Sequence, residues 1–176
     1  MQAFTKAREA FQDLNRRLLR EEARKLGERL RDGKITPAQF QAGMEKELKS
    51  SVVAAYRFEV KHKLTDGDLA RVNGVLERQG AYLHGFVKAV GETPPGDWIP
   101  ARAELYAGAA REAQTEGRFE AADDTAEWLW SGPDGPESCE ECLDLIGTTR
   151  TVAEWRDSGD RPGGMTCGSN CRCELG

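Results

Sequence analysis

The chain has 176 residues, of which 31% are charged and 7% are aromatic, and its formal net charge is −5. This length suits one domain, or a helical body with a small appendage. No apolar run approaches the roughly 20 residues that cross a bilayer, and the first residues lack the apolar stretch of a secretory signal. We therefore expect no membrane-spanning segment and a reducing compartment, where clustered cysteines are more often metal ligands than disulfides.

Charge is distributed unevenly along the chain. Residues 1–34 hold ten Lys or Arg against six Asp or Glu, whereas residues 92–144 hold three Arg against fourteen acidic residues. This asymmetry suits docking on another protein, and it also fits a solvated helix followed by an acidic surface. A general nucleic-acid-binding protein would normally be basic overall, so the balance argues against that class.

A long charged amphipathic helix is predicted over residues 3–32. Its apolar side chains recur at three- and four-residue steps. They are Phe4, Phe11, Leu14, Leu18, Leu26 and Leu30. This stripe is thin, so we expect the helix to be poorly buried alone and to pack on a partner subunit, by self-association or otherwise.

Two further helices have well-marked starts, because each begins with a residue pattern that caps the first turn. The predicted capping residues are Thr36, Pro37 and Gln39 for the second helix and Thr65 and Asp68 for the third. The glycines of the third helix, Gly74, Gly80 and Gly85, either weaken it or let another backbone approach. A fourth helix is predicted to start at Pro100, after a linker at 91–96, and Trp128-Leu-Trp130 is the one stretch that reads as a strand.

All five cysteines lie in the last 38 residues, in a segment rich in glycine. They form one pair, Cys139-x₂-Cys142, and one group of three, Cys167-x₃-Cys171-x-Cys173. Close pairs of this kind supply two zinc ligands from one turn, and zinc takes four such ligands in a tetrahedron. We predict a structural zinc site with Cys139, Cys142 and Cys167 as ligands. The spacing leaves open whether Cys171 or Cys173 is the fourth.

Other chemistry finds little support in the sequence. A redox pair or incidental thiols are the alternative to the metal site. A catalytic zinc site keeps an open position and usually has a His or carboxylate ligand, but His62 and His84, the two histidines, are expected on helices far from the cysteines. No phosphate-binding glycine loop occurs. We therefore predict no catalytic residues.

These observations predict a mainly α protein: an elongated body of about four helices with a small, irregular, zinc-binding C-terminal module. The expected division is an N-terminal charged helix at 1–34, the helical body at 35–130 and the cysteine-rich tail at 131–176.

The tail and its approach resemble the minor head, or head-morphogenesis, proteins of tailed bacteriophages, related to the minor head protein of phage Mu. The resembling segments are Trp128-Leu-Trp130, Cys139-Glu-Glu-Cys142-Leu, Ile146-Gly147, Glu154-Trp155 and Thr166-Cys167-Gly-Ser-Asn-Cys171-Arg-Cys173-Glu-Leu175. Weaker likeness in the helical segments extends the resemblance over roughly residues 26–176. Many members have His near the position of Cys167, which favours Cys167 as a metal ligand.

The resemblance implies an accessory protein of a phage head, made in the host cytoplasm and carried in the virion, that docks on portal or capsid protein. Some longer members carry an ADP-ribosyltransferase domain, but this chain has no room for one, so that activity is not expected. The alternative is a zinc-dependent nucleic-acid-binding accessory protein in DNA packaging or ejection, which would use the basic first helix, from Arg16 to Lys34, on phosphates.

Overall fold

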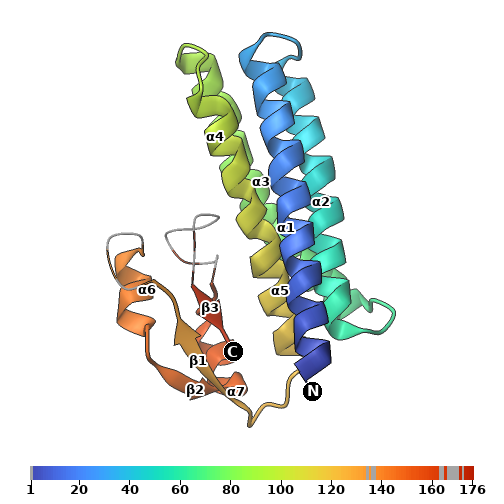
Figure 1. Ribbon diagram of the computed structural model, residues 1–176, viewed down its shortest axis with the longest axis vertical. Helices are drawn as coiled ribbons and strands as arrows, with labels where there is room; N and C mark the ends of the chain where they lie inside the picture. The colour runs from blue at the N-terminus through green and yellow to red at the C-terminus, as the bar shows by residue number, and fades with distance from the viewer. Residues whose placement is uncertain (1, 134, 136–137, 163–164, 166–170, 172) are drawn as a thin grey trace.

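The computed structural model describes residues 2–133, 135, 138–162, 165, 171 and 173–176, with the backbone alone for residues 2–5. The chain forms a bundle of long helices with a smaller α/β module beside it (Figure 1). The elements are α1 (Gln2–Arg31), α2 (Pro37–Val60), α3 (Asp66–Glu92), α4 (Trp98–Glu104), η1 (Leu105–Ala107), α5 (Gly108–Ala121), β1 (Glu127–Ser131), α6 (Glu140–Leu145), β2 (Thr149–Thr151), α7 (Val152–Ser158) and β3 (Glu174–Leu175). The mainly helical class predicted from the sequence is confirmed.

The starts of α2 and α3 follow the predicted capping boxes. The Thr36 side chain accepts from the Gln39 backbone N–H, and the Gln39 side chain accepts from the Thr36 backbone N–H. Thr65 and Asp68 make the same exchange before α3. Each box satisfies two backbone donors that a helix start leaves unpaired, so these boundaries are determined locally.

Helix α2 is the centre of the bundle and packs against α1, α3 and α5. The approach of α5 to α2 is close because Gly117 has no side chain. A Cβ at that position would lie 2.8 Å from the Tyr56 carbonyl oxygen and 3.0 Å from the Glu59 Cβ. Of the two roles offered for the glycines of α3, close approach does not apply to Gly80 or Gly85, because nothing lies within 4 Å of a Cβ placed at either.

The buried face of α1 differs from the predicted stripe. Leu14 and Leu18 are 48% and 53% exposed, whereas Leu19 and Ala23 are buried. The reason is tertiary: α1 packs against α2, α4, η1 and α5, and those contacts turn a neighbouring face inward. Gln12 is also buried on this face, where its amide donates to the Glu59 carboxylate at 3.1 Å.

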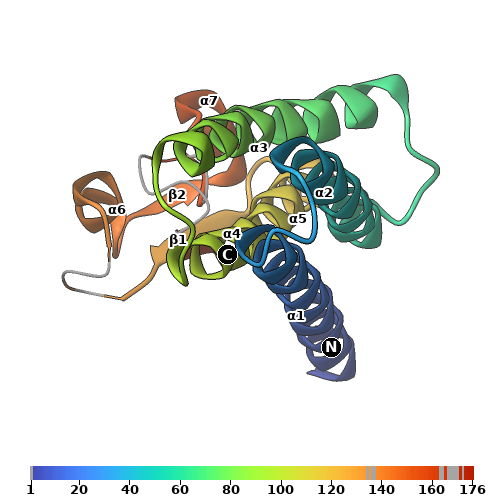
Figure 2. The ribbon, with the colours of Figure 1, turned by 90° about the horizontal axis from the view of Figure 1, so that it is seen from above.

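The helix predicted to start at Pro100 begins earlier, at Trp98, and continues through η1 into α5 as one column (Figure 1). This column ends at Ala121, and an extended segment then leads into β1. Figure 2 shows that α5 lies between α2 and the module, so α5 is the helix that the module contacts. No helix in the described part of the chain is both long and apolar enough to span a membrane.

The module contains a small antiparallel sheet with the strand order β2-β1-β3. In the register of β1, Trp128 pairs with Arg150 and Trp130 pairs with Leu175. The strand predicted at 128–130 is therefore present, while β2 and β3 were not predicted. The sheet, α6 and α7 enclose a second apolar core, which also includes Phe119 from the end of α5.

Candidate metal centre

Three cysteines reach the second core from two places in the chain. Cys142 lies on the inner face of α6, and its neighbours Glu141 and Leu143 are exposed. Cys171 and Cys173 come shortly before β3, which pairs with β1 at the edge of the sheet. One short helix and one strand therefore bring the cysteines together.

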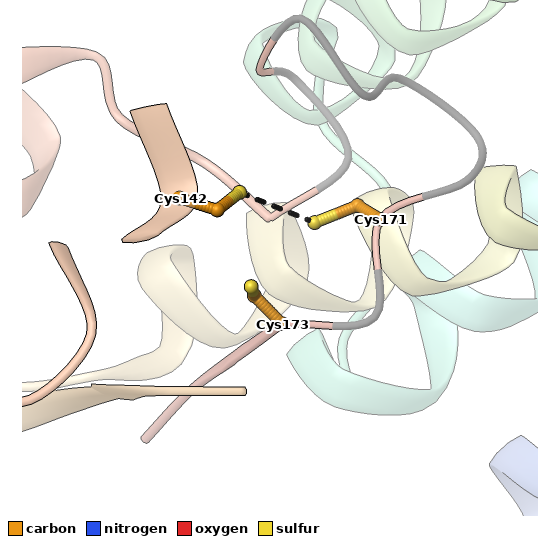
Figure 3. Close-up of side chains that lie close together, drawn as sticks. All are labelled: Cys142, Cys171 and Cys173. Carbon is orange, nitrogen blue, oxygen red and sulfur yellow. Dashed lines mark hydrogen bonds between the residues drawn. The ribbon is translucent and has the colours of Figure 1, made fainter. Parts of the chain in front are cut away.

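The three sulfur atoms are buried and lie within 4.8 Å of one another (Figure 3). Cys142 is fully buried, and Cys171 and Cys173 are 7% and 1% exposed. The Cys142 and Cys171 sulfurs are 3.9 Å apart, which is far longer than a disulfide bond of about 2.05 Å. Two sulfurs bound to one tetrahedral zinc at about 2.3 Å each lie about 3.8 Å apart. The three cysteines thus lie close enough to bind a metal ion.

The five cysteines predicted as ligands differ in where the structure places them. Cys142, Cys171 and Cys173 form the group, so both sulfurs between which the sequence could not decide belong to it. Cys139, the N-cap residue of α6, is half-buried and packs against the second core outside this group. Cys167 lies outside the described residues. A fourth ligand from Cys139 or Cys167 stays a prediction.

The indole of Trp130 supports a thiolate at this site. Trp130 is fully buried, and its Nε1–H makes no hydrogen bond of ordinary geometry with a described residue. The pKa of the Cys173 thiol is raised, chiefly by burial and then by the neighbouring Cys171; Cys142 and the Trp130 indole lower it in part. A bound cation would offset the cost of burial by stabilising the thiolates, and the indole would then donate toward sulfur, as groups around metal ligands commonly do.

Gly132 leaves room for the Cys173 side chain. A Cβ at Gly132 would lie 2.6 Å from the Cys173 sulfur and 3.2 Å from its Cα. The cysteine spacing in the sequence gives no reason to single out this glycine. Pairing of β1 with β3 is the signal that reveals it, because Gly132 directly follows the end of β1.

Helix α5 holds the cysteine segment through its arginines. Arg111 donates to the Cys171 carbonyl at 3.0 Å, and Arg118 donates to the Leu175 carbonyl at 2.6 Å. Both acceptors belong to the segment that carries two of the three sulfurs. The position of this segment therefore depends on the helical body as well as on the sheet.

Histidine contributes nothing to the described group. His84 lies on α3, as predicted. His62 was also expected on a helix, but α2 ends at Val60 and Lys61 adopts a left-handed conformation, so His62 lies in the following turn. There its ring Nε2 is 3.0 Å from the Asp68 carboxylate. A buried, all-sulfur group of this kind matches structural metal sites rather than catalytic ones.

Comparison of the chain with protein-family models, with curated proteins and with solved structures found no match. The geometry of the site and the sequence are therefore the only grounds for assigning it a function.

Proposed function

We propose that this protein is a non-enzymatic assembly protein of a tailed-phage head, which docks on portal or capsid protein and uses a structural zinc ion to fold its C-terminal module. The observation that carries the metal role is the burial of Cys142, Cys171 and Cys173 inside the second core. Zinc is the metal we propose because thiolate ligands prefer it to the other common divalent ions. The phage-head role and the virion location rest on the resemblance in the cysteine segment and the helical segments.

A folding role fits the make-up of the module. Of the eight buried core residues in the described part of the module, three are cysteines, so apolar burial there is small. Small domains of this kind usually need a metal or disulfides, and metal binding adds directly to the folding free energy. The helical body, whose core is separate and larger, supplies the exposed helix faces for docking.

The test of the metal role starts from the purified full chain. We expect about one equivalent of zinc by elemental analysis. Removal by a chelator should make residues 131–176 sensitive to protease while the far-UV circular dichroism of the long helices changes little. Unchanged proteolysis after complete metal removal would exclude a folding role. Docking is tested by co-purification with a co-expressed portal protein and, in a separate arm, with a capsid protein.

The alternative function, nucleic-acid binding, is favoured by one feature of α1. Arg16, Arg17 and Arg20 line a hollow on its outer face together with Ala10 and Asp13. Contacts with phosphates would make binding strongly dependent on salt. An absence of DNA binding at low ionic strength would remove this alternative.

A further inference from the structure

A polar cleft lies next to the cysteine segment, between the N-terminal half of α1, α5 and the strand β3, and none of the described cysteines is among its lining residues. Its volume is about 420 Å³, which is within the range of ligand-binding pockets. Its basic lining consists of Arg8 and Arg16 from α1 and Arg111 and Arg118 from α5. The cleft is therefore built by both regions of the molecule.

The four guanidinium groups form two facing pairs. Helices α1 and α5 run in opposite directions (Figure 1), so Arg8 faces Arg118 at one end and Arg16 faces Arg111 at the other. Burial and then the charge of Arg8 lower the pKa of Arg118, and burial and then Arg16 lower the pKa of Arg111. The residues of each helix are seven or eight apart, so the two pairs are about 10–12 Å apart.

The charges in this cleft are unevenly compensated. Arg8 pairs with Glu59 at 3.1 Å, and Arg16 pairs with Asp13. Arg111 has only the exposed Glu174, at 3.7 Å. Within the described part of the chain, Arg118 has no carboxylate within 4.0 Å; it donates to the Leu175 carbonyl and lies 4.7 Å from the centre of the Trp128 ring. The nearest counter-charges of Arg118, Glu59 and Glu174, act on it from beyond ion-pair distance. A half-buried guanidinium with such weak compensation favours binding of an anion.

The middle of the cleft needs a hydrogen-bond donor. Gln12 lines the cleft and is 3% exposed, and its side-chain oxygen has no hydrogen-bond partner among the residues that the structure describes. The amide orientation follows from Glu59, which accepts from the Gln12 nitrogen at 3.1 Å. A peptide carries N–H groups that can donate to this oxygen, whereas a phosphodiester backbone carries none. In addition, Glu9, Asp13 and Glu174 at the cleft would repel a continuous polyanion.

We propose that this cleft binds an acidic peptide segment of a partner protein, with one carboxylate at each arginine pair and a backbone N–H at Gln12. Guanidinium forks bind carboxylates bidentately. An extended peptide advances about 3.3 Å per residue, so acidic residues three or four apart span the two pairs. The inference rests on the proposed docking function, since it names the chemistry of the partner, but it depends on neither the zinc ion nor the phage head.

The test uses the full-length, metal-loaded protein and a fluorescent capped peptide, acetyl-Asp-Gly-Gly-Gly-Asp-amide, in a titration followed by anisotropy. We expect saturable binding. Loss of one charged hydrogen-bonding group typically weakens binding about tenfold or more, so Arg118→Gln should raise the Kd by that factor. Arg57→Gln removes the same charge from an exposed site on α2 and should leave the Kd unchanged.

A second variant separates binding from folding, because Arg118→Gln also removes the bond to Leu175. Within the described residues, the ion pair of Arg16 is with the exposed Asp13, so Arg16→Gln should weaken peptide binding without changing thermal unfolding. Equal binding of a peptide with Asn in place of Asp, or no saturable binding, would overturn the proposal. Tighter binding of a short oligothymidylate that displaces the peptide would replace it with the nucleic-acid alternative. None of these outcomes alters the zinc content or the portal capture that test the proposed function.

Discussion

The helical body and the cysteine module are stabilised in different ways. Twenty buried apolar residues from α1 to α5 form the core of the body. Among the described residues, eight form the buried core of the module, one of them Phe119 at the end of α5, and Cys142 meets Cys171 from a segment 29 residues further along the chain. A large apolar core tolerates the loss of one contact, whereas a small core built around a cluster of thiols depends on that cluster. Loss of the cysteine cluster should therefore unfold the module and spare the body, and a packing defect in the body should spare the module.

The two regions are joined by the apolar contact of Phe119 with the second core and by several polar contacts. Besides the bonds from Arg111 and Arg118, Arg161 forms an ion pair with Glu116 at 3.0 Å. Arg156 donates to the Phe119 carbonyl at 2.5 Å. Such hydrogen bonds fix orientation, and each contributes only about 0.5–3 kcal/mol. The body should therefore remain folded when the module does not.

The largest effect is expected from Cys142→Ser. Loss of this ligand should release the metal and unfold the module, because structural zinc supplies about 10–16 kcal/mol in zinc-finger peptides. The measurements are metal content and protease sensitivity of residues 131–176, with helical circular dichroism as the control for the body. Cys139→Ser is the informative companion, since retention of the metal would show that Cys139 is not the fourth ligand. Full metal content in Cys142→Ser would contradict the site.

A smaller effect, confined to the body, is expected from Gly117→Ala. The added methyl group would crowd the Tyr56 carbonyl, and overpacking typically costs about 1–3 kcal/mol. Gly80→Ala is the matched control: its Cβ meets nothing within 4 Å, so it should stabilise α3 by up to about 1 kcal/mol. Chemical denaturation followed by helical signal measures both. Equal stability of the two variants would show that the contact between α5 and α2 accommodates a methyl group without loss of stability.

The smallest effect concerns pH and Asp68. This buried carboxylate accepts from the Thr65 backbone at 2.8 Å, the Thr65 hydroxyl at 2.7 Å and the Tyr56 hydroxyl at 2.7 Å. The Thr65 backbone contact is the main cause that lowers the pKa of Asp68 below its ordinary value. Because the folded pKa lies below the unfolded value of about 3.9, the stabilisation is present above that pH and is lost as pH falls through the folded pKa.

The body should therefore lose stability below about pH 4, and Asp68→Asn should flatten that loss while costing about 1–2 kcal/mol at neutral pH. Urea denaturation between pH 2.5 and 7 would measure both quantities. Asp66→Asn, which removes an exposed carboxylate from the same turn, should keep the parent slope. An unchanged slope in Asp68→Asn would mean that other carboxylates dominate acid unfolding.

Local features of the fold could be predicted from the sequence, and nonlocal ones could not. The capping boxes at Thr36 and Thr65 involve residues three apart, so their spacing alone predicts them. The inward face of α1 is selected by four other elements, which is why Leu14 and Leu18 are exposed against expectation. In the same way, the two close-spaced cysteine groups predict one shared site, and Cys142 does meet Cys171 and Cys173. The spacing cannot show that Cys171 and Cys173 both belong to the described group while Cys139 lies outside it.

The order of the sulfurs along the chain determines which region can fold first during synthesis. Cys142 follows all the helices of the body, and Cys171 and Cys173 follow almost all of the module. Chains emerge from the ribosome N-terminus first, and domains generally fold as units in that order. A chain that stops before residue 171 can complete the bundle but lacks two of the three sulfurs. If the group binds a metal as proposed, metal retention would distinguish fully translated molecules from truncated ones.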